Sequence, residues 1–280
     1  MFGFLKSTSK DIHVCCDFCG SDDTAILYNK ARYDMKIDNV ICKKCGLVYI
    51  DPRPDEKIIR DFYKSRYREI YSNTQQVTEK ALEDTQHRAN QHVEYLKPYL
   101  KNGQKILDIG CSAGNFLKTV RETYSNCELD GIEANIAFSN YGREKYKLNI
   151  FNGMLEDYNP GRAYDLIYIS HVLEHFSSPK RALSLISNLL DENKYLFIEV
   201  PTIFFPYVKL DFFFQDAHLY TFSPNSISNL LIYNDFEVEK IESVEWFMRI
   251  IARKSKNVKK EYTYDKYYDI YKHIHEFKHE

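Results

Sequence analysis

Glycine, proline and long apolar runs are scarce in this sequence. It contains 10 glycines and 8 prolines in 280 residues, which excludes collagen-like and linker-rich chains. No stretch of about 20 uncharged apolar residues occurs, so the sequence predicts no membrane span. The most apolar region, residues 196–214, is interrupted by Glu199, Pro201, Pro206, Lys209 and Asp211. The first residues also lack the apolar core and small-residue cleavage site of a signal peptide, which favours a cytoplasmic location.

An excess of charge of either sign is absent as well. Lysine and arginine number 38 against 40 aspartates and glutamates, a net charge of −2. We therefore do not expect nucleic acid as a partner through bulk charge. Hydrophobic residues make up 44% and charged residues 28% of the chain, a composition typical of folded globular proteins. The length predicts one α/β domain with a smaller accessory unit.

The cysteines are few but regularly spaced. Four of the 7 form two Cys-x-x-Cys pairs, Cys16/Cys19 and Cys42/Cys45, each followed directly by a glycine. Four thiolates at tetrahedral corners suit Zn²⁺, and a glycine after each tight turn relieves crowding. Two buried thiol pairs are the simpler alternative, and Cys15 is an alternative ligand. With no coordination position left for water the site would be structural, which predicts a zinc ribbon over residues 1–50.

Residues 51–101 are predicted to be a helical lid or linker. Apolar positions recur at helical spacing from residue 55, and a longer helix is predicted over residues 78–100. Between these helices, residues 65–72 are polar and rich in tyrosine, which favours a lid. Tyr67 and Tyr71 are the candidates to close over a ligand, with exposed aromatics on a helix surface as the alternative.

Residues 105–116 are predicted to form a buried strand, a turn of small residues and the start of a helix, and three motifs compete for the turn. A dinucleotide fingerprint needs G-x-G-x-x-G, but only Gly110 and Gly114 are present. Gly110-x-Ser112-x-Gly114 matches the G-x-S-x-G nucleophile elbow. Against this, Asp108 would place a carboxylate beside the nucleophile, and no oxyanion motif precedes it. The third interpretation is a methyl-donor cofactor loop, and the residues that follow favour it.

The residues after the turn repeat a strand-and-helix pattern in order. A short strand ends in Glu133, where an acid is placed to bind ribose hydroxyls. A third strand and turn cover residues 150–157, a fourth strand and turn residues 164–175, and a fifth strand residues 195–201. Over residues 102–253 this order resembles class I S-adenosylmethionine (SAM)-dependent methyltransferases. The resemblance implies an α/β fold, a doubly wound, mostly parallel, seven-stranded Rossmann-like sheet, with the small zinc ribbon before it.

The same resemblance implies roles for residues along the cofactor. Asp108 would contact the methionine amine, directly or through water, and Glu133 would bind the ribose. The simpler alternatives for this pair are a turn residue and a solvated strand end. Ser112 stands where the loop of this family usually has its middle glycine. Further cofactor-binding residues are expected in the turn, beside the adenine and in the lid: Gly110, Ser112, Gly114, Leu155, Glu156, Tyr67 and Tyr71.

Residues 171–175 read His-Val-Leu-Glu-His, which matches the H-x-x-E-H pattern of inverted zinc proteases. Proteases of that class place the motif inside a long helix, whereas here it directly follows a predicted strand. Some small-RNA and quinone methyltransferases have a similar turn that binds a divalent ion, which His171, Glu174, His175 and His218 would imitate. Transfer to a hydroxyl also needs a proton acceptor. The catalytic candidates are His171 and His218, because histidine titrates at about pH 6.5, and His175, whose ring the turn alternatively holds as a structural residue.

The zinc ribbon ahead of this domain narrows the resemblance to bacterial methyltransferases that modify sugars and cell-envelope precursors. This narrower resemblance implies methyl transfer to an oxygen of a sugar, a nucleotide-sugar or a related capsule precursor in polysaccharide biosynthesis. Carbon methylation of a deoxysugar is one alternative, disfavoured because no counterpart of the large carboxy-terminal domain of those enzymes is seen. A methyltransferase that grips RNA with its zinc ribbon is another.

Two segments complete the prediction. Residues 203–214 and 236–252 are expected to supply the second half of the sheet. The aromatic residues of the first segment would form either the acceptor pocket or a packed insert. Residues 254–280 change to a lysine- and tyrosine-rich composition, which predicts a tail, a helix packed on the body or a homodimer contact. The expected partners are thus a small sugar-type molecule and a second copy of the chain.

Overall fold

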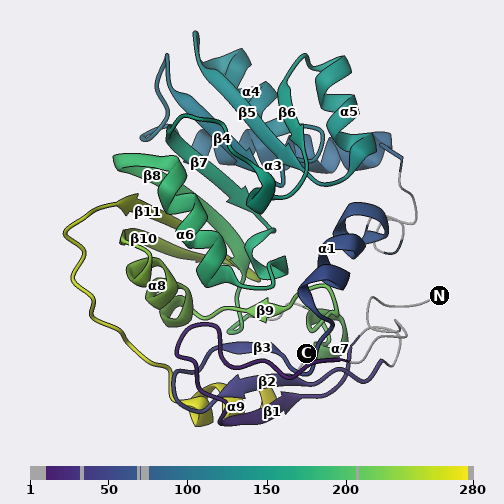
Figure 1. Ribbon diagram of the computed structural model, residues 1–280, viewed down its shortest axis with the longest axis vertical. Coiled ribbons are helices and arrows are strands. Elements are labelled where there is room, and N and C mark those ends of the chain that lie inside the picture. Colours follow the sequence, from purple (N-terminus) through teal and green to yellow (C-terminus); the bar gives the residue numbers. More distant parts are fainter. Residues whose placement is uncertain (1–10, 32–34, 68–69, 71–75, 206–207, 277–280) are drawn as a thin grey trace.

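The computed structural model describes residues 11–31, 35–67, 70, 76–205 and 208–276. Its larger sheet has seven strands in the order β10-β11-β8-β7-β4-β5-β6 (Figure 1). These strands are β4 (Lys105–Ile109), β5 (Glu128–Glu133), β6 (Asn149–Asn152), β7 (Tyr164–Ser170), β8 (Leu190–Pro201), β10 (Phe236–Val244) and β11 (Phe247–Lys254). The strands from β8 to β6 are parallel, and β11 runs antiparallel to β8 and to β10. The predicted mostly parallel, seven-stranded Rossmann-like sheet is confirmed.

Helices cover both faces of this sheet because apolar side chains of the central strands point alternately to either face. Ile106 and Tyr168 pack with residues of α3 and α4 on one face. Their strand neighbours Leu107 and Ile167 pack with residues of α6 and α8 on the other. The main helices of this part are α3 (Glu79–Tyr95), α4 (Asn115–Thr123), α5 (Ile136–Lys145), α6 (Pro179–Leu189) and α8 (Pro224–Tyr233).

The helices of the predicted lid region begin at capping residues. α1 (Glu56–Ser65) follows Asp55, whose carboxylate accepts a hydrogen bond from the N–H of Ile58 at 2.9 Å. α3 follows Thr78, whose hydroxyl accepts from the N–H of Ala81 at 3.2 Å. A side-chain acceptor here satisfies a backbone donor that the helix itself leaves unpaired. Both predicted helix starts are confirmed, although α3 ends earlier than predicted.

The amino-terminal segment forms a second sheet that includes a strand from far along the chain. Its order is β1-β2-β3-β9, with β1 (Thr24–Tyr28), β2 (Asn39–Cys42), β3 (Val48–Ile50) and β9 (Tyr220–Thr221). Buried Arg53 adds to this connection, because its guanidinium donates to the carbonyl of Ser177 at 2.7 Å and to the hydroxyl of Tyr220 at 3.1 Å. The ribbon is thus joined to the body through backbone and side chains. The domain boundaries at residues 50, 101 and 253 stay predictions.

The prediction of a strand within residues 203–214 is wrong for the part of this segment that the structure describes. The segment instead contains the short helix α7 (Leu210–Phe213). β11 already pairs with the edge of β8, so the chain that leaves β8 has no neighbouring strand to join there. Phe213 and Phe214 are buried against apolar residues of β1 and β2. The alternative of a packed insert therefore describes this segment, whereas the strands predicted within residues 236–252 are present as β10 and β11.

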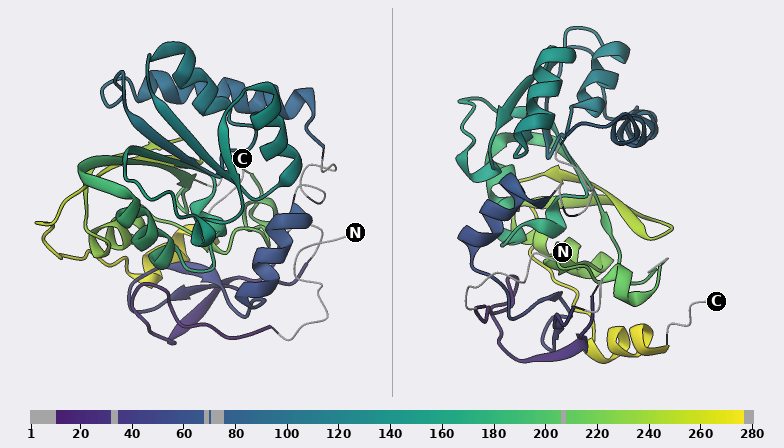
Figure 2. Two further views of the ribbon diagram at one scale, coloured as in Figure 1. Left: turned by 45° about the horizontal axis from the view of Figure 1, so that its top comes forward. Right: turned by 90° about the vertical axis from the view of Figure 1, so that its right-hand side faces the viewer.

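The carboxy-terminal segment returns to the ribbon. Helix α9 (Tyr267–Glu276) buries Ile270 and Ile274 in the same apolar cluster as β1 and β2, and Figures 1 and 2 show it beside those strands. Of the alternatives for residues 254–280, a helix packed on the body is the one observed, and a homodimer contact stays a prediction. Among the helices of the described residues, none is both long enough and apolar enough to cross a membrane.

Asp130 on β5 is an acid whose ionisation stabilises the sheet. Its carboxylate accepts hydrogen bonds from the hydroxyl of Tyr164 at 2.5 Å, from the amide of Asn149 at 2.6 Å and from Arg162. Burial by itself would raise the pKa of Asp130, but these three donors outweigh it and lower the pKa below its usual value. The ionised carboxylate therefore stabilises the fold above the unfolded-state pKa of about 3.9, and this contribution is lost as the pH falls through the folded-state pKa.

We expect Asp130→Asn to lower the free energy of unfolding by about 2 kcal/mol at pH 7, because it leaves the buried hydroxyl of Tyr164 and the other two donors with a weaker acceptor. Urea unfolding at pH 7 and at successively lower pH measures this difference, which should shrink as the wild-type carboxylate takes up its proton. The exposed acid Asp191 supplies the control Asp191→Asn. An equal loss at every pH would contradict the assignment.

Candidate active site

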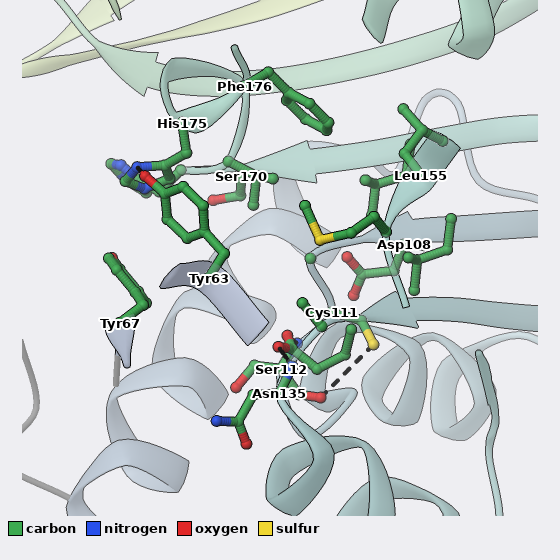
Figure 3. A pocket seen from close by; sticks show the side chains of 18 of the residues that line it. Tyr63, Tyr67, Asp108, Cys111, Ser112, Asn135, Leu155, Ser170, His175 and Phe176 are labelled. Carbon is green, nitrogen blue, oxygen red and sulfur yellow. Dashed lines mark hydrogen bonds between the residues drawn. The ribbon is translucent and has the colours of Figure 1, made fainter. Parts of the chain in front are cut away.

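A cavity of about 360 Å³ opens at the carboxyl ends of β4, β5 and β7 (Figure 3). The chain leaves β4 toward β5 on one side and reaches β7 on the other, and such a switch point is where open α/β sheets bind ligands. Gly114 and His218 do not line this cavity, and Tyr71 lies outside the described residues. The lining residues that the sequence predicted are Tyr67, Asp108, Gly110, Ser112, Glu133, Leu155, Glu156, His171 and His175.

The turn after β4 brings backbone to the cavity. Gly110 has a φ of 75°, and a Cβ atom there would lie 2.3 Å from Val172 Cγ2, so the position requires glycine. Ser112 has a φ of 53°, in a region that residues other than glycine rarely adopt. Gly114, with a φ of 84°, is the capping residue of α4. The strain at Ser112 gives a physical reason why a glycine is usual at that position.

Glu133 at the end of β5 joins two loops. Its carboxylate accepts hydrogen bonds from the N–H of Ser112 at 2.8 Å and from the N–H of Asn135 at 2.7 Å. The residue is 8% exposed, so a solvated strand end does not describe it. A carboxylate offers about four lone-pair positions, and those not used by the backbone can accept hydrogen bonds from hydroxyls of a ligand.

Asp108 at the end of β4 lies beside this carboxylate. The side chain is buried at the inner end of the cavity. Burial raises the pKa of Asp108 well above its usual value, and the negative charge of Glu133 raises it further. Two acids that face one cavity favour a ligand with a positive charge, because a cation would compensate both the burial and their mutual repulsion.

Helix α1 closes the cavity from the side of η2 (Leu155–Asp157), the 3₁₀ turn after β6. Arg60 on α1 lies 3.6 Å from a carboxylate oxygen of Glu156 and donates to Asp157 at 2.6 Å. Tyr63 and Tyr67, on and just after the same helix, lie at the other end of the cavity beside His175, away from Asp108 (Figure 3). The helix predicted as a lid thus contacts both ends of the cavity.

His171 follows β7 directly and has both ring nitrogens close to acids. Its φ of 52° is unusual for a residue with a side chain. Nε2 lies 3.2 Å from Glu199 Oε1, and Nδ1 lies 3.6 Å from Glu174 Oε1. Burial would lower the pKa of His171, but the two carboxylates outweigh it and raise the pKa. An imidazole that is protonated at both nitrogens is a poor proton acceptor, which disfavours His171 as the catalytic base.

Glu199 connects three strands and a helix beneath the cavity. Its buried carboxylate accepts hydrogen bonds from His92 Nε2 at 2.8 Å, Arg249 Nε at 2.9 Å and the hydroxyl of Ser170 at 3.0 Å. Burial would raise the pKa of Glu199, but its histidine partners hold it well below the usual range. His92 Nδ1 in turn lies 2.7 Å from the hydroxyl of Tyr168, which lines the cavity. The carboxylate therefore positions groups on the wall of the cavity.

The ring of His175 in η3 (Leu173–His175) is held by a backbone carbonyl of a distant segment and by a side chain of α1. Nδ1 lies 2.7 Å from the carbonyl oxygen of Ala217 and 3.0 Å from the hydroxyl of Tyr63, which itself donates to that carbonyl at 2.6 Å. The ring of His218 lies 5.0 Å away, centre to centre. Two predicted catalytic histidines are thus brought together. Both belong with Glu174 to a group whose potential ligand atoms all lie within 4.8 Å of one another.

Sequence reasoning missed several residues around the cavity. Asn135 is one of them, although an asparagine just after the strand-end acid Glu133 is a recognisable helix-capping signal. Glu199 had a signal too, as the one acid within the apolar run of residues 195–201 that ends β8. Tyr63 had none, because its position reads as part of the apolar face of a helix. Its contact with His175 joins segments that are 112 residues apart.

The four predicted zinc ligands also lie together. Sγ of Cys16 is 3.5 Å from Sγ of Cys45, and Sγ of Cys19 is 3.5 Å from Sγ of Cys42. All four sulfur atoms lie within 4.8 Å of one another. Cys15, the alternative ligand, is exposed and outside this group. Four thiols converging on one point fit the donor set and the tetrahedral geometry of a structural Zn²⁺ site.

The sheet order, the glycine turn and the two strand-end acids define the fold of the class I SAM-dependent methyltransferases. The family model described as "Methyltransferase domain" matches residues 81–241. The chain belongs to this methyltransferase domain family, which confirms the predicted class of enzyme.

Similar proteins support the same class. A (S)-tetrahydroprotoberberine N-methyltransferase from Eschscholzia californica is 28% identical over 106 residues, covering 36% of this chain and 30% of that protein. A malonyl-(acyl-carrier protein) O-methyltransferase from Ilyobacter polytropus is 27% identical over 95 residues, covering 32% of this chain and 35% of that protein. The chain thus spans about a third of the length of these curated relatives.

Among solved structures, a magnesium protoporphyrin IX methyltransferase from Synechocystis with bound S-adenosylhomocysteine (SAH) superposes with a TM-score of 0.52. It is 19% identical, and the match covers 72% of this chain and 100% of that chain. At this identity the match shows the fold.

Proposed function

We propose that this protein transfers the methyl group of SAM to an oxygen of a sugar, a nucleotide-sugar or a related capsule or cell-envelope precursor. The observation that carries the SAM part is the placement of Asp108 and Glu133 in one cavity at the switch point of the sheet. In the proposed pose, Glu133 accepts from the ribose hydroxyls and Asp108 lies near the methionine ammonium. Leu155 and Glu156 flank the adenine, and the backbone of residues 110–114 lies along the methionine.

Methyl transfer requires mainly that the acceptor be aligned with the methyl group and that water be excluded. As the acceptor oxygen attacks the methyl carbon, the bond from that carbon to the sulfonium sulfur breaks, and SAH leaves. The hydroxyl proton must go to another group. Tyr63 and Tyr67 cover the methyl end of the cavity, where they exclude water and present rings on which a sugar can pack. This combination supports a sugar-type acceptor. The relatives named above methylate nitrogen or oxygen, so a nitrogen acceptor is the competing outcome.

The group that acts on the acceptor hydroxyl is proposed to be the cluster of Glu174, His175 and His218. His175 lines the cavity, and the ring of His218 lies edge-on to the ring of His175. His171 is proposed to position the acceptor as a cation, because both of its ring nitrogens face carboxylates. Tyr71 remains a proposed lid residue on the basis of its sequence position alone.

We expect His218→Ala to lower the turnover number at least tenfold while the affinity for SAH stays unchanged. The reason is that His218 belongs to the acceptor-side cluster and does not line the cofactor cavity. Turnover assays with saturating SAM and calorimetry with SAH separate the two effects. The exposed His87, whose Nε2 lies 3.0 Å from the side-chain amide of Gln91 along α3, supplies the control His87→Ala. Near wild-type turnover in His218→Ala would remove this residue from the proposed cluster.

The acceptor is identified by a screen of nucleotide-sugars and capsule precursors with methyl-labelled SAM. The label is then located in the product by mass spectrometry and NMR. A label on a sugar oxygen supports the proposal, whereas a label on carbon identifies a deoxysugar C-methyltransferase and a label on nitrogen a different acceptor class. A failure of the protein to bind either SAM or SAH would refute the methyl-transfer proposal as a whole.

The division of the chain is part of this proposal. Residues 1–50 would form a zinc ribbon in which Cys16, Cys19, Cys42 and Cys45 hold one structural Zn²⁺, a thiolate site that fits a reducing cytoplasm. Residues 51–101 would form the lid and linker, residues 102–253 the catalytic domain, and residues 254–280 a segment that docks on the ribbon. The support for the ribbon is the convergence of the four sulfur atoms, and for the lid the contacts of α1 with both ends of the cavity.

A further inference from the structure

Glu174 is a buried acid without a hydrogen-bond donor in the described part of the chain. The residue is fully buried, and neither carboxylate oxygen has a partner there within hydrogen-bond distance. His171 Nδ1 lies 3.6 Å and His175 Nε2 lies 4.0 Å from Oε1. Burying a carboxylate is costly unless a cation or several donors compensate its charge. His171, at 3.6 Å and shared with Glu199, offsets part of this charge, but no donor among the described residues reaches Glu174 at hydrogen-bond distance, so the carboxylate can accept a further cation.

Two histidines face the same point. Glu174, His175 and His218 each offer one ligand atom, and these atoms lie within 4.8 Å of one another. Glu174 and His175 come from η3, and His218 comes from the segment just before β9. A carboxylate and two imidazoles are a donor set that binds divalent transition metals and leaves coordination positions open.

The hydrogen bonding of His175 is typical of a histidine that coordinates a metal ion. Its Nδ1 lies 2.7 Å from the carbonyl oxygen of Ala217, to which an Nδ1–H would donate. In the neutral ring this leaves the lone pair on Nε2, the nitrogen on the side of Glu174. Histidines that bind metals usually donate their second ring nitrogen to a carbonyl or a carboxylate in this way, which fixes the tautomer and the orientation of the ring.

We propose that Glu174, His175 and His218 bind one divalent cation of the Mn²⁺, Fe²⁺ or Zn²⁺ type at the acceptor end of the cavity. His175 lines the cavity and both histidines are partly exposed, so the open coordination positions face the space where the acceptor lies. The cation would hold the acceptor hydroxyl and lower its pKa, and the proton would pass out to bulk water on the side of the partly exposed histidines before the oxygen attacks the methyl group. This last role rests on the proposed function, whereas the binding of the cation does not.

The test uses Mn²⁺ alone with the full-length protein, followed by electron paramagnetic resonance of free and bound Mn²⁺. Mn²⁺ prefers oxygen and nitrogen ligands, so the cysteine cluster should not compete for it. We expect one Mn²⁺ site in the wild type and at least tenfold weaker binding in Glu174→Gln, which keeps the shape of the side chain. Glu122→Gln removes an exposed acid from α4 and should bind Mn²⁺ like the wild type.

A second measurement covers the case that a variant folds poorly. Mn²⁺ should raise the unfolding temperature of the wild type and of Glu122→Gln, but not that of Glu174→Gln or His218→Ala. Absence of Mn²⁺ binding in the wild type, or equal binding in wild type and Glu174→Gln, would overturn the proposed metal site. SAH binding is measured separately. The metal site can therefore be refuted while the proposed methyl transfer stands, and methyl transfer can be refuted while the metal site stands.

Discussion

Replacing Glu133 by glutamine is expected to weaken SAH binding about a hundredfold. In the proposed pose the carboxylate accepts hydrogen bonds from the ribose hydroxyls while it also accepts from the N–H groups of Ser112 and Asn135. Hydrogen bonds to a charged group contribute about 1.5–3 kcal/mol each, and the amide keeps only one acceptor oxygen. A net loss of about 3 kcal/mol corresponds to about a hundredfold in the dissociation constant. Isothermal titration calorimetry with SAH measures it directly.

The same strand supplies a matched control for this variant. Glu128 is the exposed residue at the other end of β5, so Glu128→Gln should bind SAH like the wild type. Thermal unfolding without ligand shows whether loss of the contacts to Ser112 and Asn135 loosens the loops. If Glu133→Gln kept both its stability and its affinity for SAH, Glu133 would have only its structural role, and the proposed position of the ribose would be wrong.

Replacing Cys42 by serine is expected to remove the proposed zinc and to destabilise the amino-terminal sheet. Structural Zn²⁺ contributes about 10–16 kcal/mol in isolated zinc-finger peptides, more than the total stability of most small domains. Cys42 ends β2, the strand that pairs with both β1 and β3. Elemental analysis should find about one zinc per chain in the wild type and close to none in Cys42→Ser. Calorimetry should show a new unfolding transition at lower temperature.

Cys15→Ser is the matched control, because Cys15 is exposed and adjacent to a proposed ligand. Retention of one zinc and of the wild-type unfolding profile is expected for this variant. If Cys15→Ser lost its zinc and Cys42→Ser kept it, Cys15 would be a zinc ligand in place of Cys42. A wild-type protein purified without chelators and free of zinc would instead favour two buried thiol pairs.

The sequence predicted the parts of the fold that depend on local patterns. The apolar run before Gly110 forms a central strand because it is buried on both faces. The helices after Asp55 and Thr78 start where a side chain can accept a backbone hydrogen bond. The strand-end acids Asp108 and Glu133 were recognisable because parallel strands end at one edge of a sheet, so residues at those ends meet wherever they lie in the chain.

The segment at residues 203–214 shows where local patterns mislead. Its aromatic residues read equally well as a strand, as pocket walls or as an insert. The pairing of β11 with β8 decides among these, because it leaves no free edge on β8 for the segment that follows that strand. The apolar side chains then have to be buried elsewhere, and the ribbon offers the surface. Such competition between segments is set by the whole sheet and not by the segment itself.

The amino-acid pattern alone determined the class of fold, the position of the glycine turn after β4 and the two Cys-x-x-Cys motifs, because these depend on spacings of a few residues. Only the tertiary structure decided which side chains stand beside His175, at the end of the cavity away from Asp108. It brings His218 to Glu174 and His175, and it brings Glu199 to His92 across 107 residues of chain. Contacts of this kind leave no periodic trace in a sequence, since each partner is placed by the packing of its own helix or strand against the sheet.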